Sequence, residues 1–493
     1  MEPGKLEKAR MYEMKQEKNI SPDQRPAFHL SPRTGWLNDP NGFSFYKGQY
    51  HLFYQYHPYS IKWGPMHWGH AVSKDLLKWE YLPCALAPDQ EYDKGGCFSG
   101  SAVTMDDGRQ LLMYTGCTED VFDPNADLHQ VQCIAVGDGL NYTKYEGNPV
   151  LDVTDLPDQS HPADFRDPKV WRNADGSYAA VVSSMDVNHS GQLILFKSPD
   201  GFDWSFDKVL LVNNRRLGLM WECPDFFEMD GKKVILVSAM DMLPEGFEYH
   251  NGNSNLCLIG SYDPEDKEFN IESSQVIDGG IDFYACQTLQ IADGRRIMIG
   301  WMQNPDSSNY TVGEMPWYGQ MSIPREIFLK DGRLWQVPLR ELADHRCNPV
   351  TYTGQRIKGE QSLEGIHGRR VDMELRIRPA DPENVYRNFI IRFAKNDQFW
   401  SGLSFRPDEK ILRVDRKFSG SRRAIIHQRR CEIKTYEDEL QLRIILDSNS
   451  IEVFINGGEQ AMTAAIYTPQ EADQISFFTD GEVEMDIVKY ELR

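Results

Sequence analysis

The 493-residue sequence lacks any run of about eighteen consecutive apolar residues, the minimum for a transmembrane helix. Residues 1–20 mix lysine with glutamate and contain no apolar core, so we expect a short surface helix there and no signal peptide. Cations are in deficit, with 53 Lys and Arg against 74 Asp and Glu and a formal net charge of −21. This balance disfavours nucleic-acid partners and anionic membranes, because both carry the same sign of charge.

Closely spaced cysteine pairs are also missing. The chain has nine cysteines, an odd number, and no two of them have the CxxC spacing typical of zinc or redox sites. Most lie within apolar runs. We therefore expect reduced thiols in the core, a cytoplasmic location, and no metal or other cofactor.

Long helical patterns are scarce, and the hydrophobic period is mostly two rather than 3.6. Residues 51–56 and 233–237 are typical strand sequences, rich in β-branched and aromatic side chains. Hydrophobic residues make up 40% of the chain and aromatic residues 12%, which is enough for a packed core. These features predict an all-β protein.

Glycine-containing turns recur along the first two thirds of the chain, each between two apolar runs, as in a β-hairpin. The five glycines are Gly48, Gly108, Gly176, Gly231 and Gly294, with spacings of 60, 68, 55 and 63 residues. One hairpin per unit of this length fits the four-stranded blade of a propeller. Five units predict a five-bladed β-propeller.

Equivalent positions in the five units are found nine residues before each turn glycine. They are Asp39, Ser99, Asp167, Glu222 and Ala285. The first strand of each propeller blade lines the central axis, so we expect these residues on the innermost strands of five different blades. Three of the five are acids, which predicts a group of carboxyls at the axis.

Grouped carboxylates repel one another, so the pKa of at least one should rise. Such a site can hold one ionised and one protonated carboxyl at neutral pH, as the cleavage of a glycosidic bond with retention requires. We expect Arg166 to keep its neighbour Asp167 ionised. Cation binding is the alternative chemistry, but the acids lack the clustering of a calcium loop. The nearby aromatic rings suit the C–H faces of sugars, with core packing as the alternative for any single ring.

The segments around the acids, residues 36–42, 165–168 and 221–224, resemble the three signature motifs of glycoside hydrolase family 32. That family contains invertases, sucrose-6-phosphate hydrolases, inulinases and levanases. Further segments that resemble the family are 98–101, 282–288 and 322–326. The resemblance runs from about residue 25 to the end of the sequence and implies a five-bladed β-propeller followed by a C-terminal β-sandwich.

By this resemblance, Asp39 is the nucleophile that forms a fructosyl-enzyme intermediate. Glu222 is the general acid and then the general base, and Asp167 stabilises the transition state. Six more residues match positions that contact the fructosyl unit: Asn38, Gln55, Trp63, Phe98, Ser99 and Arg166. Trp301 is a looser match to such a position, and Cys223 follows the acid as in many microbial members. The implied activity is that of a retaining β-fructofuranosidase.

Several alternatives stay open at this point. The sequence does not choose between sucrose, sucrose 6-phosphate and short fructo-oligosaccharides as the sugar partner. A fructosyltransferase would use the same intermediate, because a sugar acceptor competes with water for it. A non-catalytic carbohydrate-binding propeller is disfavoured by the three intact acids, and an arabinan-cleaving enzyme by the motif at 36–42. A homodimer is a further option.

The turn repeat stops after residue 340. We expect four parts: an N-terminal extension over 1–25, the propeller over 26–340, a loop-like linker over 341–354 and a β-sandwich over 355–493. Clean alternation of apolar and polar residues at 371–378 supports the sandwich. We interpret the basic stretch 416–430 as a solvated face of that domain, with an interdomain or dimer contact as the alternative.

Overall fold

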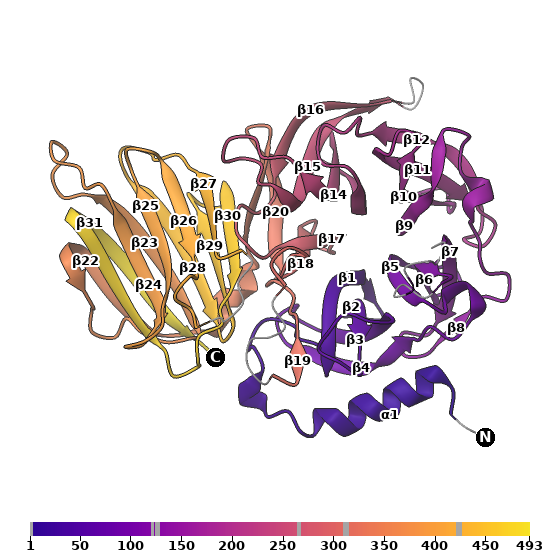
Figure 1. Cartoon of the computed structure of the whole chain (residues 1–493), viewed down its shortest axis with the longest axis horizontal. Helices are drawn as coiled ribbons and strands as arrows, with labels where there is room; N and C mark the ends of the chain where they lie inside the picture. Colours follow the sequence, from indigo (N-terminus) through magenta and orange to yellow (C-terminus); the bar gives the residue numbers. More distant parts are fainter. Residues whose placement is uncertain (1–2, 120–122, 124–128, 264–267, 309–314, 421–425) are drawn as a thin grey trace.

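The computed structural model describes residues 3–119, 123, 129–263, 268–308, 315–420 and 426–493. They form a ring of small sheets beside a larger C-terminal sheet domain, so the predicted all-β fold is confirmed (Figure 1). The α-helix of this part of the chain is α1 (Lys5–Glu17). Short 3-10 helices are η1 (Pro22–Gln24), η2 (Glu91–Asp93), η3 (Val153–Asp155) and η4 (Arg340–His345). No helix of the described residues is long and apolar enough to cross a membrane.

Five sheets make up the ring, each with four antiparallel strands. The four strands are consecutive along the chain except in blade 5, where residues 317–318 come between the second and third strands. Blade 1 contains β1 (Gly35–Tyr46), β2 (Gln49–His57), β3 (His67–Ser73) and β4 (Trp79–Leu86). Blade 2 contains β5 (Gly96–Thr104), β6 (Gln110–Cys117), β7 (Gln130–Gly137) and β8 (Tyr142–Lys144). Blade 3 contains β9 (Ser160–Arg172), β10 (Tyr178–Asp186), β11 (Gly191–Ser198) and β12 (Ser205–Val212). Blade 4 contains β13 (Trp221–Met229), β14 (Lys232–Met242), β15 (Gly252–Asp263) and β16 (Glu268–Val276). Blade 5 contains β17 (Tyr284–Gln290), β18 (Arg296–Trp301), β20 (Arg325–Lys330) and β21 (Arg333–Pro338).

The first strands of the five blades contact one another in a closed ring, in the order β1, β5, β9, β13, β17 and back to β1. The two-residue strand β19 (Trp317–Tyr318) lies between β18 and β20 along the chain. It pairs in parallel with the start of β1 and so connects the last blade to the first. The five turn glycines have φ between 76° and 92°, the left-handed region that favours glycine. The turn spacing therefore identified real hairpins, and the predicted five blades are present.

Helix α1 packs along β4, the outermost strand of blade 1. Arg10 Nε donates to the carbonyl of Cys84 at 2.9 Å, and the buried carboxylate of Glu13 accepts the Cys84 N–H at 2.8 Å. These side chains use backbone groups that an outermost strand otherwise leaves unpaired. The helix thus covers the edge of the first blade.

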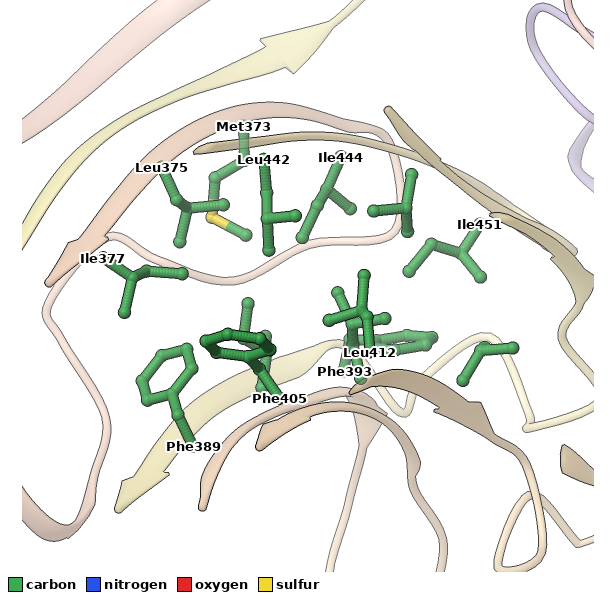
Figure 2. Packing of buried hydrophobic residues seen from close by; sticks show 14 of the residues in the cluster. Met373, Leu375, Ile377, Phe389, Phe393, Phe405, Leu412, Leu442, Ile444 and Ile451 are labelled. Atoms are coloured by element: carbon green, nitrogen blue, oxygen red, sulfur yellow. The ribbon is translucent and has the colours of Figure 1, made fainter. Parts of the chain in front are cut away.

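The C-terminal domain is one continuous sheet folded into two layers. Its strands are β22 (Arg346–Gln361), β23 (Val371–Pro379), β24 (Phe389–Lys395), β25 (Ser401–Arg406), β26 (Ile411–Asp415), β27 (Gln428–Glu432), β28 (Leu440–Asp447), β29 (Ser450–Ile455), β30 (Gln460–Ala465) and β31 (Gln474–Leu492). Strand β31 pairs with β24 through its first residues and with β23 through its last, so it belongs to both layers. Apolar side chains such as Leu442 and Ile444 in one layer face Phe389 and Phe405 in the other (Figure 2).

The segment expected to be a linker, 341–354, is not loop-like. The helix η4 runs to His345, and β22 begins at Arg346. Within the described residues, strand β22 pairs with β31 alone and is largely exposed, so it carries no clear alternation of buried apolar residues. An edge strand of this kind resembles a loop in sequence, which explains the wrong expectation.

The interpretation of 416–430 as a solvated face is wrong for Arg416. Its side chain is 1% exposed and forms an ion pair with Asp282, which precedes β17 of the propeller. Arg429 also reaches the propeller, where it donates to the carbonyl of Asn251 at 3.3 Å. Here the alternative of an interdomain contact is correct. Arg422 and Arg423 lie outside the described residues.

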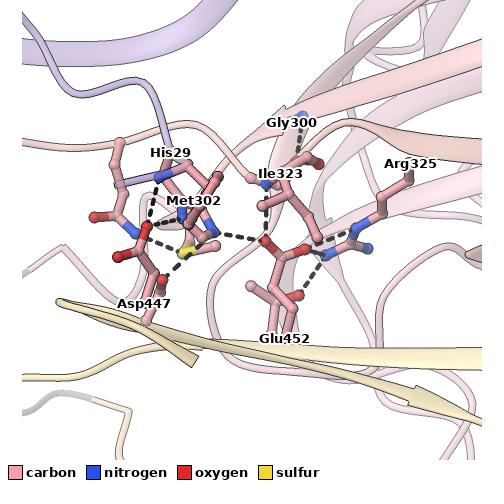
Figure 3. A network of polar contacts seen from close by, with 12 residues as sticks. His29, Gly300, Met302, Ile323, Arg325, Asp447 and Glu452 are labelled. Carbon is pink, nitrogen blue, oxygen red and sulfur yellow. Dashed lines mark hydrogen bonds and ion pairs between the residues drawn. The ribbon is translucent and has the colours of Figure 1, made fainter. Parts of the chain in front are cut away.

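A second set of buried charges joins the two domains, and we call it the interdomain cluster: His29, Asp278, Arg325, Asp447 and Glu452. Figure 3 labels all of them except Asp278. The two ring nitrogens of His29 contact Asp447 Oδ2 at 2.8 Å and Glu452 Oε1 at 2.9 Å. Arg325 donates to Glu452 through Nε and to Asp278, both at 2.9 Å. All these side chains are at most 1% exposed.

Candidate active site

Each innermost strand contains a β-bulge. The paired residues on either side of it are Leu37 and Pro40 in β1, Phe98 and Gly100 in β5, Arg166 and Lys169 in β9, Glu222 and Asp225 in β13, and Tyr284 and Gln287 in β17. A bulge redirects side chains and interrupts strand pairing, and bulges are common next to active sites. The five positions predicted from the turn spacing lie within these bulges or next to them, on five different blades as expected.

Glu222 shares the offset of nine residues from its turn glycine but differs in its place at the bulge. It is the last paired residue before its bulge, whereas Asp39 and Asp167 lie inside theirs. The difference from blade 3 reflects hairpin length, because a two-residue turn closes the hairpin of blade 4 and a five-residue turn that of blade 3. Blade 1 also has a two-residue turn, but β1 contains a second irregularity between Asn41 and Ser44. Counting back from the turn glycine therefore locates the bulge only to within one residue.

Asp39 is half-buried at the bulge of β1. Its Oδ1 accepts a hydrogen bond from Asn38 Nδ2 at 2.9 Å, and its Oδ2 accepts one from Ser99 Oγ at 2.6 Å. Trp36 Nε1 donates to Asn38 Oδ1 at 2.7 Å and so orients the Asn38 amide. The carboxylate is held in one orientation by donors from two blades.

Asp167 is buried and has a φ of 62° in the bulge of β9. Its Oδ2 accepts the backbone N–H of Cys223 at 2.9 Å. The Cys223 sulfur lies 3.7 Å from the same oxygen and 3.6 Å from Asp39 Oδ2, so the thiol lies between two carboxylates. Burial holds the pKa of this thiol well above its usual value, and the nearby carboxylates raise it further. Cys223 is therefore a neutral donor.

The backbone N–H groups freed by the bulges are satisfied by side chains of the preceding blade. Gly100 donates to Asn41, Asp167 to Thr115, Cys223 to Asp167, and Ala285 to Ser238, all between 2.9 and 3.1 Å. The bulges of blades 2 to 5 are thus each fixed by the preceding blade. This arrangement holds the carboxyl groups in place before any ligand binds.

Two side chains of the described residues contact the Glu222 carboxyl group. Tyr284 Oη donates to Glu222 Oε2 at 2.7 Å, and an Arg166 guanidinium nitrogen lies 3.3 Å from Oε1. The same guanidinium group lies 3.0 Å from Asp164 Oδ1. The Glu222 side chain is 18% exposed, so it remains accessible to a ligand.

Burial raises the pKa of Glu222; the charge of Arg166 opposes this rise, and the charge of Asp39 adds to it. Burial also raises the pKa of Asp167. The charge of Arg166 opposes this rise, and the charges of Glu222 and Asp39 add to it. The charge of Arg166 thus lowers the pKa of Asp167, in the expected direction, but burial outweighs it. Arg166 forms its ion pairs with Asp164 and Glu222 instead, because the bulge turns Asp167 away from its sequence neighbour. We call Asp39, Asp167 and Glu222 the axial acids.

The other predicted binding residues lie around the axial acids at different depths. Phe98 and Trp63 make an edge-to-face contact at 6.0 Å, and Trp63 is 37% exposed. Gln55 is buried, with its amide donating to the carbonyl of Cys97 at 3.0 Å. Trp301 pairs with Tyr284 across β17 and β18, and its ring lies 6.0 Å from that of Trp36.

The residue-by-residue prediction missed Tyr284 and Asp164 as contacts of the site. Tyr284 occupies the same place before its bulge as Glu222 does in the previous blade. This equivalence could have identified Tyr284 as a contact of the site. The offset of nine residues from the turn glycine selected Ala285 instead. Asp164 lies two residues before Arg166 and has no counterpart in the repeat. Among the described residues, no group of three or more His, Cys, Asp or Glu side chains is arranged to hold a metal ion.

The family comparison identifies the chain. The glycosyl hydrolases family 32 N-terminal domain matches residues 29–338, and the family 32 C-terminal domain matches residues 341–492. The chain belongs to glycosyl hydrolase family 32 and is a glycoside hydrolase. The three segments around the axial acids thus carried a correct resemblance.

Relatives of this family 32 chain match nearly its whole length. It is 37% identical to the raffinose invertase of Escherichia coli, over 92% of this chain and 91% of that protein. It is 34% identical to the sucrose-6-phosphate hydrolase of Bacillus subtilis, over 95% of this chain and 94% of that protein. A family 32 β-fructofuranosidase of Bombyx mori, solved in complex with sucrose, is 33% identical, with a TM-score of 0.83 over 99% of this chain and 98% of that chain.

Proposed function

We propose that the chain is a retaining β-fructofuranosidase that hydrolyses sucrose, sucrose 6-phosphate or short fructo-oligosaccharides. The observation that carries the proposal is the junction of three carboxyls from three blades, in which Cys223 contacts both Asp39 and Asp167 and Arg166 contacts Glu222. The names of the relatives, raffinose invertase and sucrose-6-phosphate hydrolase, support this substrate class. A cytoplasmic location is part of the proposal and is supported by the nine cysteines, which are all free thiols.

In the first step, a carboxylate oxygen of Asp39 attacks the anomeric carbon of the fructosyl unit. The glycosidic bond breaks as its oxygen takes the proton of Glu222, and a covalent fructosyl-enzyme remains. In the second step, ionised Glu222 removes a proton from water, which attacks the same carbon and releases fructose. Asp39 and Glu222 then regain their starting states.

The electrostatics of the site support this division of roles. The pKa of Glu222 is raised, so its acidic form persists to higher pH than that of an ordinary glutamate. Two hydrogen-bond donors orient Asp39. Asp167 would accept hydrogen bonds from fructose hydroxyls and stabilise the oxocarbenium-like transition state. Arg166 would hold Glu222 in position. Its positive charge would then stabilise the negative charge that develops on Glu222 as the proton leaves.

The remaining assignments concern recognition of the sugar. Asn38, Ser99 and Cys223 lie within hydrogen-bond distance of the Asp39 carboxylate, so they are proposed to border the fructosyl unit. Phe98 and Trp63 offer apolar ring surface beside it. Gln55 and Trp301 would support these residues from behind, as both are buried.

The test is the release of fructose by one preparation from sucrose, sucrose 6-phosphate, 1-kestose and inulin. We expect hydrolysis of at least one small fructoside and little activity on inulin, with the anomeric configuration retained in the first product observed by NMR. Release of fructose from none of the four, by a protein with a normal melting transition, would exclude the proposal. Inversion at the anomeric carbon would exclude only the double-displacement mechanism and not the hydrolysis of fructosides.

A further inference from the structure

Asp164 is an acid at the edge of the site to which neither the turn repeat nor the family resemblance gives a role. It lies in β9, three residues before Asp167, and its side chain is 30% exposed. Its Oδ1 lies 3.0 Å from a guanidinium nitrogen of Arg166. Asp164 therefore contacts the same cation as Glu222 does.

The guanidinium group of Arg166 lies between two carboxyl groups. Nη2 faces Asp164 at 3.0 Å, and Nη1 faces Glu222 Oε1 at 3.3 Å. Nη2 also lies 3.7 Å from the sulfur of Met240 in β14, and the Arg166 side chain is 16% exposed. One positive charge is thus divided between two carboxyls, and Asp164 is the nearer of the two.

This sharing changes what Arg166 does to the acid. A nearby cation favours the ionised form of a carboxyl group, so an undivided guanidinium charge would work against a protonated Glu222. The general acid must carry a proton when the substrate binds. The charge of Asp164 offsets that of Arg166 at Glu222, because it has the opposite sign and lies beside the cation. Accordingly, Asp164 raises the pKa of Glu222, whereas Arg166 lowers it.

The other titratable groups that interact with Glu222 come from the neighbouring strands and from its own: Asp39 of β1, Asp167 of β9, Tyr284 of β17 and Cys223 of β13. The charge of Asp39 raises the pKa of Glu222, and the hydrogen bond from Tyr284 lowers it. These groups contact the acids directly or take part in the proposed reaction. Asp164 is reached from Glu222 through the shared guanidinium group.

From this geometry we infer that Asp164 is a positioning residue for the acid step, which holds one end of the Arg166 guanidinium group and shares its charge, so that Glu222 keeps its proton while Asp39 is ionised. The inference rests on the proposed function and extends it, since it explains how the acid stays protonated beside an arginine. Asp164 acts through Arg166 and not by contact with the reacting atoms.

The test removes the charge of Asp164 and keeps its contact. Asp164 has a φ of 62°, in the left-handed region that asparagine also adopts. In Asp164→Asn, the amide oxygen can still accept from Arg166 but carries no charge. The alkaline limb of kcat/KM for sucrose should therefore move to lower pH, by about half a unit to one unit. The pH-independent value of kcat/KM should stay within about twofold of the wild type.

Asp207→Asn is the matched control. The Asp207 carboxyl is 31% exposed and forms an ion pair with Lys197 at 3.3 Å on β12, the outermost strand of the same blade. Its removal should leave the limb in place, because water and salt screen a distant exposed charge. Asp164→Gly also fits the left-handed backbone and should move the limb in the same direction as Asp164→Asn. It serves as the test if the asparagine variant does not fold.

A fructoside with a good leaving group shows whether the effect passes through Glu222. Its first step needs little proton donation, so the pH profile of that step, measured by rapid quench, should be the same in Asp164→Asn and the wild type. A shift of equal size with this substrate would overturn the role of Asp164. So would a sucrose limb that stays in place, moves to higher pH or moves equally in Asp207→Asn, although sucrose hydrolysis by the wild type would still uphold the proposed function. Absence of any fructose release by the wild type would overturn the proposed function and the inference with it.

Discussion

The interdomain cluster and the axial acids both bury ionisable groups, but they differ in how the charges are paired. In the interdomain cluster, each carboxylate faces a cation: Asp447 faces His29, Asp278 faces Arg325, and Glu452 faces both. At the propeller axis, Arg166 is the cation that the structure places against the acids, and Asp164 shares it. The first arrangement has two cations for three carboxylates and leaves no carboxylate without a cation in contact. The second has one cation for the axial acids and Asp164, so its excess of negative charge is larger.

The pKa directions follow this difference. Burial alone would raise the pKa of Asp447, but hydrogen bonds and the charge of His29 lower it to about 2. Burial alone would lower the pKa of His29, but the two carboxylates raise it to about 9. At the propeller axis, burial and mutual repulsion outweigh the attraction of Arg166, so the pKa values of Asp167 and Glu222 rise. Paired charges contribute to stability, whereas unpaired acids are ready to exchange protons.

The largest effect expected is on catalysis at Asp39. Asp39→Ala removes the attacking oxygen, so kcat for sucrose should fall by about 10⁴-fold or more. The melting temperature should stay close to that of the wild type or rise, because repulsion within the axial acids is relieved. A large fall in melting temperature would show that Asp39 also stabilises the fold, as the interdomain cluster does.

Glu222 should show the next largest effect, and one that depends on the leaving group. In Glu222→Ala, the first step with sucrose should slow by roughly 10²–10⁴-fold, since the leaving oxygen receives no proton. A fructoside with a good leaving group should form the covalent intermediate at nearly the wild-type rate, measured by rapid quench. Equal losses on both substrates would contradict the role of Glu222 as the acid.

The interdomain cluster should respond in stability rather than in rate. Arg325→Met leaves Glu452 and Asp278 partly unpaired, so the free energy of unfolding should fall by about 3–5 kcal/mol. The kcat of the protein that remains folded should not change. Arg356→Met is the control, because its ion pair with Glu482 at 3.2 Å is exposed; it should cost at most about 1 kcal/mol.

The stability of the chain should also depend on pH through His29. Its pKa in the folded state is about 9 and its ordinary value is 6.5, so its contribution is fully present below pH 6.5 and is lost as the pH rises through 9. For a fully buried group, this amounts to about 3 kcal/mol. Denaturation midpoints between pH 6 and pH 9.5 measure it, and His29→Gln should flatten the profile. An unchanged slope in that variant would assign the loss to another group.

The smallest effect expected is a shift of the activity profile by Tyr284. Its hydroxyl donates to Glu222 and lowers the pKa of that acid. Tyr284→Phe should therefore move the alkaline limb of kcat/KM to higher pH, by about one unit or less. Glu222→Gln, by contrast, should abolish that limb. A limb that stays in place in Tyr284→Phe would show that the hydrogen bond is not formed in the active state.

Local features of the chain made much of the fold predictable. The turn glycines need a left-handed backbone, and the runs on either side alternate with period two, so both signals are written into short segments. The edge strand β22 escaped prediction because it buries little on either face. The axial acids were predictable because each lies near a turn that repeats once per blade.

Contacts between distant segments were not predictable in the same way. The sequence around Arg416 predicts an exposed side chain, but its ion-pair partner Asp282 lies in the other domain and buries it. Arg166 follows Phe165 in a motif that predicted it beside Asp167, yet the bulge directs it to Glu222. The partners of His29 lie more than four hundred residues away, at Asp447 and Glu452. No local pattern encodes such pairs.

The sequence by itself determined the blade count, the strand periodicity and the identity of the axial acids, because these depend on backbone preferences and side-chain chemistry within each repeat. The tertiary structure decided which charges meet, which carboxyls are left without a cation, and how buried charges join the two domains. The physical reason is that burial and Coulomb interactions depend on distances in space, and the closed ring of blades and the folded sheet set those distances only when the whole chain has come together.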